Sequence, residues 1–179
     1  MEIDEKLLGE MYDLVQKEAI RSVLMRYARG VDRCDRELIR SVYHEDAWDD
    51  HGPFKGTGFD FADSPYRYSD ANRIGHHAIS TNIIELDGDV AYSESFYIFH
   101  GIRAEPDGDI AVETAGRYVD RFEKRDGEWK IAYRTTTLDW CREYPLIGEW
   151  KDAGAYVRPR RYRDDICYQP EQLVRPNGS

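Results

Sequence analysis

The chain has 179 residues and a formal net charge of −10; 41% of its residues are hydrophobic and 13% are aromatic. This length fits one domain, and the apolar content is enough for a packed core, which argues against a disordered chain. The acidic excess repels a phosphate backbone and argues against nucleic acid as a partner.

Helices come first in the predicted order of elements. From Asp4 to about Arg33, apolar residues recur at spacings of three and four, which predicts an amphipathic helix that faces the core. Gly30 and the polar residues 32–35 break this pattern. A short amphipathic helix is predicted next, and its apolar residues are Leu38, Ile39, Val42 and Tyr43.

Extended segments dominate the rest of the predicted domain. Residues 47–58 indicate a short strand that leads into loops, and residues 59–72 a further helix or a lid. Four long extended runs follow, at residues 76–86, 90–103, 110–125 and 128–142. Asp-Gly pairs between these runs supply the positive φ that tight hairpins require, so we predict an antiparallel meander. Helices followed by a meander predict an α+β fold, with the helices on one concave face of the sheet.

The end of the chain lacks the regular hydrophobic patterns of the preceding segments. The predicted domain spans residues 1–145, and residues 146–179 are expected to form an irregular extension. The dense basic stretch in this extension consists of Arg158, Arg160, Arg161 and Arg163. Asp164 and Asp165 dilute its charge, so we interpret it as a solvated tail rather than as a docking site.

Two features bear on where the protein works. No stretch approaches the roughly 18 apolar residues that a membrane helix needs, and the N-terminus lacks the basic and apolar segments of a signal peptide. Cys34, Cys141 and Cys167 are an odd number without CxxC spacing, which argues against a disulfide framework and against a zinc site. We therefore expect a cytoplasmic protein with reduced thiols and no membrane partner.

Three stretches of the sequence resemble one protein superfamily. They are RYARGVDRCDRELIRSVYHEDAWDDHGPFKG, HHAISTNIIELDGDVAYSESF and GRYVDRFEKRDGEWKIAYRTTTLDW, and they span most of residues 20–140. Their order and spacing resemble SnoaL-like members of the nuclear-transport-factor-2-like superfamily. The resemblance implies a cone in which a curved antiparallel sheet and N-terminal helices enclose a pocket. Fold alone does not decide the chemistry.

The superfamily contains cofactor-free dehydratases, dehydrochlorinases and isomerases, and also non-catalytic members such as the small subunits of ring-hydroxylating dioxygenases. Its eliminating enzymes use an Asp–His pair. The resemblance implies that Asp32, at the late-helix position, and His77, at the first-strand position, form this pair, with Tyr27 five residues before Asp32. His76 takes the place of His77 if the strand register is off by one.

Such a pair suits proton transfer near neutral pH, because the ordinary pKa of histidine is about 6.5. A carboxylate hydrogen-bonded to one ring nitrogen fixes the tautomer and stabilises the imidazolium, which is the role expected for Asp32 beside the base His77. Tyr27 could donate a hydrogen bond to a leaving oxygen. From the residues alone, the alternatives are a histidine packed at a strand start, an aspartate that caps a helix and a core tyrosine.

One departure from the related dehydratases concerns a cation. They often carry an arginine near the end of the last strand, where this sequence has Asp139. Arg117 or Arg134 could supply the positive charge from a neighbouring strand; the alternative is an exposed charge at a strand position.

Other side chains are candidates for substrate binding, because they are aromatic or polar and fall in segments expected around the pocket. The candidates are Tyr43, Trp48, Asp50, His51, Phe96, Arg117, Tyr118, Asp139 and Trp140. Phe54, Tyr97 and Phe99 add to the aromatic density, although strand alternation allows only some rings to face inward. A pocket lined in this way would suit a flat aromatic or polycyclic ligand.

The pattern of residues supports neither a metal site nor a nucleotide-binding motif. His44, Asp46, Asp49, Asp50 and His51 are residue types that bind metals, but they lack the ligand spacing of known sites and are interpreted as a polar pocket rim. No Gly-rich loop follows a predicted strand and opens a helix, so a nucleotide is not supported. We expect neither a metal nor a cofactor.

We expect a cofactor-independent lyase that removes water or another small fragment from an aromatic or polycyclic substrate by Asp–His acid–base catalysis. The lignin-dimer γ-formaldehyde lyases, which convert diarylpropanes to stilbenes, are a specific relative within the superfamily. The alternatives are a steroid-type isomerase, with a carboxylate base and an oxyanion hole, and a non-catalytic ligand-binding module. An apolar outer sheet face predicts a homo-oligomer, either a dimer or a trimer.

Overall fold

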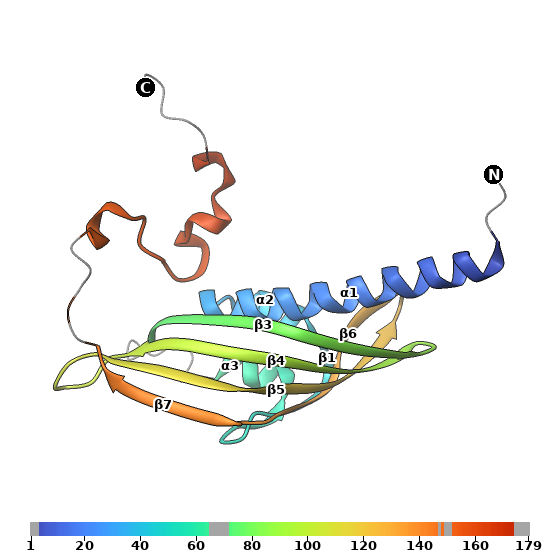
Figure 1. The fold of residues 1–179 in the computed structure, drawn as a ribbon, viewed down its shortest axis with the longest axis horizontal. Coiled ribbons are helices and arrows are strands. Elements are labelled where there is room, and N and C mark those ends of the chain that lie inside the picture. The colour runs from blue at the N-terminus through green and yellow to red at the C-terminus, as the bar shows by residue number, and fades with distance from the viewer. Residues whose placement is uncertain (1–3, 65–71, 147, 149–151, 174–179) are drawn as a thin grey trace.

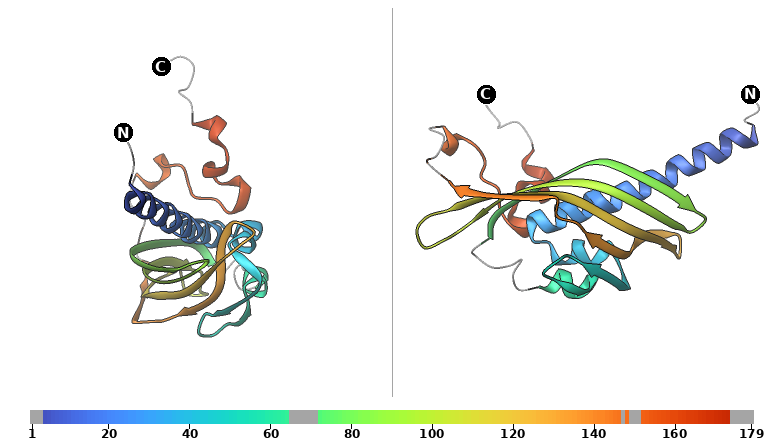
Figure 2. Two further views of the ribbon diagram at one scale, coloured as in Figure 1. Left: turned by 90° about the vertical axis from the view of Figure 1, so that its right-hand side faces the viewer. Right: turned by 60° about the horizontal axis from the view of Figure 1, so that its bottom comes forward.

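The computed structural model describes residues 4–64, 72–146, 148 and 152–173. Its longer helices are α1 (Glu5–Arg33), α2 (Arg36–Ser41) and α3 (Gly58–Asp63). Its strands are β1 (Tyr43–Asp50), β2 (Lys55–Thr57), β3 (Asn72–Asp87), β4 (Val90–Arg103), β5 (Ile110–Arg125), β6 (Glu128–Thr136) and β7 (Trp140–Pro145). These strands form one curved sheet, and α1 lies across its concave face (Figure 1 and Figure 2). The predicted α+β cone is confirmed.

The sheet has the order β2-β1-β6-β5-β4-β3, and β7 pairs with the other end of β5. Strands β3 to β6 form the predicted antiparallel meander, whereas β1 pairs with β6 in parallel. At the turn between β5 and β6, Asp126 and Gly127 have φ values of 53° and 84°. Two successive positive φ values are the geometry of a type I′ turn, which is why an Asp-Gly pair stands there.

The single strand predicted at residues 128–142 is wrong, because the chain divides there into β6 and β7. Both strands pair with the same edge of β5, and residues 137–139 between them form a bulge opposite Gly116 and Arg117. A Cβ at Gly116 would lie 2.0 Å from the carbonyl oxygen of Thr137. The bulge is held by a hydrogen bond from Thr137 N to Arg117 O (2.9 Å). The break therefore comes from close contact with a glycine on a neighbouring strand, which alternation along one strand does not encode.

The end of α1 agrees with the prediction. The helix, with Asp4 as its N-cap, runs to Arg33, and Gly30 lies in its last turns. Gly30 lies where α2 packs against α1, and a Cβ there would lie 2.9 Å from Ile39 Cγ1. The helix ends at Cys34, which has a left-handed φ of 56°. The glycine thus serves helix packing rather than helix termination.

The core lies between the inner side of α1 and the concave face of the sheet. Its fully buried apolar residues include Ile20, Val23, Leu24, Ile39, Phe61, Phe122 and Ile131. The first turns of α1 project beyond the sheet (Figure 1), and Leu7 and Leu8, in the first turn of the helix, are 46% and 51% exposed. Among the described residues, no helix combines the length and apolarity needed to cross a bilayer.

Two further segments were predicted less sharply. The helix or lid expected at residues 59–72 corresponds to α3 in its first part, and residues 65–71 of that prediction lie outside the described residues. Beyond β7, short 3₁₀ helices occur at Ala153–Ala155, Tyr162–Asp164, Ile166–Tyr168 and Pro170–Gln172.

Candidate functional site

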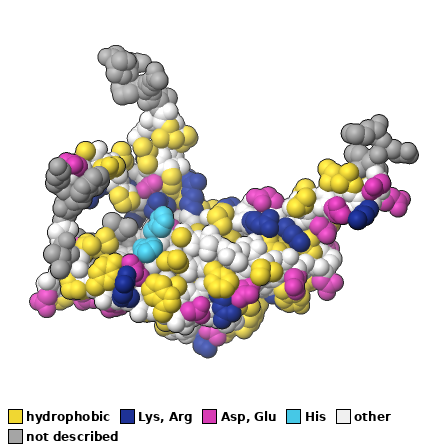
Figure 3. Space-filling view, viewed as in Figure 1, with side chains coloured by type: hydrophobic (Ala, Val, Ile, Leu, Met, Phe, Trp, Pro, Cys, Tyr) yellow, Lys and Arg dark blue, Asp and Glu magenta, His cyan; other side chains and the backbone are white. Residues whose placement is uncertain are grey.

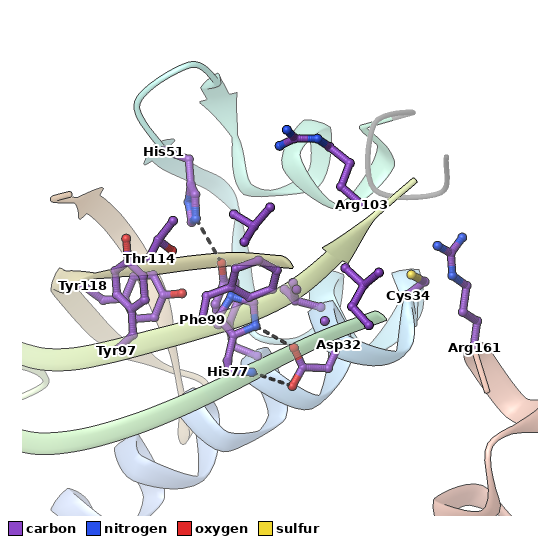
Figure 4. A pocket seen from close by; sticks show the side chains of 16 residues that line it. Asp32, Cys34, His51, His77, Tyr97, Phe99, Arg103, Thr114, Tyr118 and Arg161 are labelled. Carbon is purple, nitrogen blue, oxygen red and sulfur yellow. Dashed lines mark hydrogen bonds and ion pairs between the residues drawn. The ribbon is translucent and has the colours of Figure 1, made fainter. Parts of the chain in front are cut away.

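A cavity of about 280 Å³ lies where the C-terminal end of α1 meets the inner face of β3, β4 and β5 (Figure 4). Aromatic side chains form much of its wall, namely Tyr27, Tyr97, Phe99 and Tyr118. Asp32, His77 and His51 also line it, with His51 on a different side from the other two. The cavity therefore combines flat apolar surfaces with groups that can move protons.

Asp32 and His77 form a close pair in one wall of the cavity. Asp32 Oδ1 lies 2.6 Å from His77 Nδ1, and Asp32 Oδ2 accepts a hydrogen bond from the backbone N–H of His77 (3.0 Å). The two side chains are only 10% and 9% exposed. These two contacts fix the position of the imidazole ring and leave its Nε2 available to a ligand.

The register of β3 decides between the two neighbouring histidines. His77 pairs with Phe99 of β4, and their ring centres lie 4.7 Å apart at the cavity. His76 is exposed, because successive side chains of a strand point to opposite faces of the sheet. Of the two, it is therefore His77 that faces a ligand in the cavity.

A second histidine–carboxylate pair enters the cavity from the end of β1. His51 Nδ1 lies 2.9 Å from Asp49 Oδ1, and His51 Nε2 lies 3.5 Å from the Tyr27 hydroxyl. The fully buried Asp49 also accepts a hydrogen bond from the Tyr43 hydroxyl (2.5 Å). Burial raises the pKa of the Asp49 carboxyl, but the hydrogen bond and charge of His51 and the charge of Arg134 outweigh it, so the pKa is lowered below its usual value. Asp49 is therefore ionised near neutral pH.

A buried arginine lies behind two of the tyrosines. Arg134 forms a two-bond ion pair with Asp120 (2.7 and 2.8 Å), and both residues are buried. Its guanidinium carbon lies 4.1 Å from the ring centre of Tyr27 and 4.2 Å from that of Tyr118. Burial opposes the charge on Arg134, but Asp120 and the tyrosines hold its pKa well above the usual value. Arg134 thus places a positive charge behind the tyrosine wall without lining the cavity.

The sequence profile of the SnoaL-like domain matches residues 13–135, a range that contains both histidine pairs and Arg134. The chain belongs to the SnoaL-like domain family. The resemblance drawn from the three sequence stretches is thereby confirmed. No curated protein sequence matches the chain significantly.

Solved structures share the fold of this SnoaL-like protein at low sequence identity. A hexachlorocyclohexane dehydrochlorinase of type 2 has a TM-score of 0.70 at 17% identity, over 80% of this chain and 99% of that chain. A candidate scytalone dehydratase from Novosphingobium aromaticivorans has a TM-score of 0.66 at 22% identity, over 78% and 97%. A protein of unknown function from Mycobacterium tuberculosis has a TM-score of 0.58 at 27% identity, over 74% and 75%. These likenesses support the cone architecture.

Most of the predicted substrate-binding residues lie outside the cavity. Those that do not line it are Tyr43, Trp48, Asp50, Phe96, Arg117, Asp139 and Trp140. Trp48 and Asp50 flank the inward Asp49, so strand alternation turns them outward. Phe96 and Arg117 pair across β4 and β5 on the outer face of the sheet. Only His51 and Tyr118 of this predicted set face the ligand space.

Three other predicted residues lie outside the cavity for different reasons. Asp139 and Trp140 are exposed at the bulge between β6 and β7. The prediction of one continuous strand did not include this bulge. Tyr43 does point inward, but it is 1% exposed in the core and contacts Asp49 rather than the cavity. A ring on the correct face of a strand can therefore still be part of the core.

The polar residues considered as a metal site diverge in the structure. Asp49 and His51 meet beside the cavity, whereas His44 Nε2 contacts a backbone carbonyl of β5 (2.9 Å). Asp46 and Asp50 form ion pairs at the surface. Within the described ranges, no group of three or more histidine, cysteine or acidic side chains is placed to hold a metal.

The C-terminal segment adds a side chain that the sequence analysis missed. Asp165, which is 3% exposed, accepts hydrogen bonds from the backbone N–H groups of Arg160 (2.8 Å) and Cys167 (3.0 Å) and pairs with Arg33 of α1 (3.5 Å). These contacts anchor the segment at the end of α1, and Arg161 lies at the mouth of the cavity (Figure 4). Arg158, Arg160 and Arg163 are exposed, as expected for a solvated stretch, whereas Asp165 is a buried anchor.

Other residues that line or support the cavity were not predicted, and they differ in whether a sequence pattern could have indicated them. Thr114 lines the cavity and shares the parity of Tyr118 along β5, and Asp49 lies two residues before His51. Alternation could therefore have placed both on the inner face. Cys34 and Arg103 line the cavity because of where α1 ends and how far β4 extends, and no local pattern encodes this.

Proposed function

We propose that this SnoaL-like protein is a cofactor-independent lyase that eliminates water from an aromatic or polycyclic substrate. The observation that carries the proposal is the Asp32–His77 pair, 2.6 Å apart, in a cavity walled by aromatic rings. The fold neighbours add support, because two of them are named as a dehydrochlorinase and a candidate dehydratase.

His77 is the base in this proposal. Its Nδ1 is occupied by Asp32, so its Nε2 takes the proton from the substrate, and the carboxylate stabilises the imidazolium that forms. Tyr27 also lines the cavity, and its hydroxyl donates to the oxygen that leaves. One group thus accepts a proton from the substrate while another gives one to the leaving group.

The substrate that best suits these residues is an aryl compound with a benzylic hydroxyl. A phenol can form a quinone methide when that hydroxyl departs, so the substrate itself takes the place of a cofactor as electron sink. The stacked rings of Tyr97 and Tyr118, 4.6 Å apart, offer a flat surface for such a ring.

A diarylpropane with a terminal CH₂OH group is the specific case. After its benzylic hydroxyl has left as water, His77 removes the proton of the terminal hydroxyl. The bond from the adjacent carbon to the CH₂OH carbon then breaks, and its electron pair restores the aromatic ring as a phenolate. The phenolate takes back from solvent the proton that the phenol gave up when the quinone methide formed. The products are a stilbene, formaldehyde and water.

The test is incubation with phenolic and O-methylated benzylic-alcohol dimers, followed by stilbene absorbance and formaldehyde release. We expect turnover of the phenolic dimers alone, since an O-methyl group prevents quinone methide formation. Equal turnover of the methylated dimers would contradict this route. No product from any aryl alcohol would contradict the lyase function and favour a ligand-binding module.

A steroid-type isomerase is less well supported by the geometry. It needs a carboxylate that is free to act as the base. Asp32 lines the cavity but is bound to His77 through both carboxylate oxygens. This arrangement favours histidine as the base.

A further inference from the structure

The Tyr27 hydroxyl has a supporting pair of its own, separate from Asp32 and His77. Tyr27 OH lies 3.5 Å from His51 Nε2, and His51 Nδ1 lies 2.9 Å from Asp49. The contacts thus run from carboxylate to imidazole to phenol and end at the cavity. The two histidine pairs share no residue and no element, since one follows β1 and the other joins α1 to β3.

Asp49 is placed so that it stays ionised without contact with solvent. It has no exposed surface, and its carboxylate accepts hydrogen bonds from Tyr43 and contacts His51. A buried charge is unfavourable for folding unless it is paired, and an apolar residue at such a position usually stabilises a core as well or better. A buried ionised pair beside a cavity is therefore a candidate for function rather than for stability.

Titratable and charged groups reach His51 and its partner from several elements. They are Asp49 and Asp50 of β1, Tyr27 of α1, Tyr118 of β5 and Arg134 of β6, the last paired with Asp120. Phe61 of α3 packs on the ring at 4.5 Å, and Thr136 Oγ1 of β6 lies 3.2 Å from Nδ1. The Asp49 carboxylate contacts the ring at 2.9 Å, and its negative charge stabilises a protonated imidazole.

We propose that Asp49, His51 and Tyr27 form a proton relay that protonates the leaving oxygen. This proposal rests on the lyase function proposed above. Tyr27 gives its proton to the oxygen as the C–O bond breaks and the bonding electrons leave with the oxygen. The His51 Nε2 proton moves to the Tyr27 oxygen, and His77 takes the proton that the substrate loses. Each turnover ends with neutral His51 and protonated His77; His77 then releases its proton to solvent, and His51 takes one back from solvent.

The relay is tested by changing the leaving group. His51→Gln keeps a side chain that can hydrogen-bond to Asp49 but cannot carry a proton. With a benzylic alcohol, kcat should fall roughly 10²–10³-fold, whereas with the matching acetate ester, whose leaving group needs no proton, it should fall less than about tenfold. The loss of activity at high pH, where His51 has no proton to give, should disappear in the variant.

His44→Gln is the matched control, because His44 is a histidine of the neighbouring strand β1 that is buried but does not line the cavity. It should leave both rates and the pH profile unchanged. Equal losses for the alcohol and the ester in His51→Gln, with an unchanged pH profile, would assign His51 a structural role and overturn the relay.

A measurement without turnover separates the relay from the lyase function. Nitrogen NMR of the imidazole rings should show both nitrogens of His51 protonated at neutral pH, and Asp49→Asn should remove one of these protons. A neutral His51 in the wild type would overturn the relay whatever the activity. A protonated His51 in a protein that turns over neither substrate would overturn the lyase function, and with it the relay's role, while the charge state of the pair stands.

Discussion

Asp32 contacts His77 at two points, the imidazole Nδ1 and the backbone N–H. One residue therefore controls both the tautomer of the ring and its place on β3. An asparagine at position 32 would keep a similar shape but would lose the negative charge that stabilises the imidazolium. The two residues should for this reason behave as one catalytic unit.

His77→Ala and Asp32→Asn are each expected to lower kcat by roughly 10²–10⁴-fold, because each removes acid–base assistance. The double variant should be little slower than the slower single variant, since the effects of a unit do not add. Stilbene formation measures the rates, and circular dichroism checks the fold. His76→Ala is the control and should keep the wild-type rate; an inactive His76→Ala beside a normal His77→Ala would contradict the assignment.

Asp49 links the second pair to stability at acid pH. Its folded-state pKa is lowered below the ordinary 3.8, so its contribution to stability is fully present above that value and is lost as the pH falls through the lowered pKa. Asp49→Asn should be about 1–3 kcal/mol less stable at neutral pH. It should also lose less free energy of unfolding than the wild type on acidification from about pH 5 to about pH 3. Urea unfolding measures both values, and parallel losses in the two proteins would contradict the pKa shift.

At the scale of elements, the bulge at residues 137–139, between β6 and β7, shapes one wall of the cavity. The carbonyl oxygen of Thr137 lies in this bulge and accepts a hydrogen bond from the hydroxyl of Tyr97 (3.0 Å). Tyr97 also lines the cavity. The close approach at Gly116 thus positions an aromatic ring of the site.

Gly116→Ala is expected to lower the free energy of unfolding by about 1–3 kcal/mol, because the added Cβ overlaps the backbone of Thr137. Ligand affinity should fall as well, since the position of the Tyr97 ring depends on its hydrogen bond to Thr137 in the same bulge. Gly9→Ala is the control; no atom lies within 4 Å of its Cβ position, and it should raise stability by about 0.5–1 kcal/mol. Urea unfolding measures the free energy of unfolding of each variant. An unchanged value for Gly116→Ala would show that the bulge at Thr137 can move to make room for the Cβ.

The C-terminal segment is the second element that completes the site. Asp165→Ala should release the backbone on either side of Arg161, because it removes the hydrogen bonds to Arg160 N and Cys167 N. We expect KM for an aryl substrate to rise roughly 3–10-fold while kcat changes less, as for the loss of a binding contact. Arg163→Ala, which removes an exposed pair with Glu37, is the control. An unchanged KM in Asp165→Ala would mean that the anchor does not serve the cavity.

At the scale of the whole molecule, apolar side chains remain exposed on the outer face of the sheet and on the projecting turns of α1, where they appear in yellow in Figure 3. Those on the sheet include Tyr92, Phe96, Ile98, Val119 and Tyr133, each between 38% and 52% exposed. Monomers seldom expose such a surface, which supports the proposal that copies of this chain associate through the sheet.

Phe96→Glu combined with Val119→Glu should reduce the mass measured by light scattering at micromolar concentration to that of a monomer. Two charges on the face would be buried without partners in the oligomer, whereas they are solvated in the monomer. Leu8→Glu, in the first turn of α1, tests the other apolar surface and should leave the mass unchanged. A monomeric wild type would contradict association through the sheet.

The sequence by itself determined the order of the helices and strands, the α+β class and the hairpin turns, because periodicity and Asp-Gly chemistry act over a few residues. Through a resemblance to a family rather than through any local pattern, it also predicted Asp32, His77 and Tyr27 as site residues, and all three line the cavity. Strand alternation could have recovered Thr114 and Asp49 and rejected Trp48 and Phe96.

Only the tertiary structure decided which inner residues meet. The parallel pairing of β1 with β6 brings His51 to Tyr27, 24 positions earlier in the chain. The bulge opposite Gly116 divides the predicted last strand into β6 and β7. The anchor Asp165 brings Arg161 to the cavity. These contacts depend on sheet register, on close backbone approach and on packing between distant segments, which no local pattern of residues records.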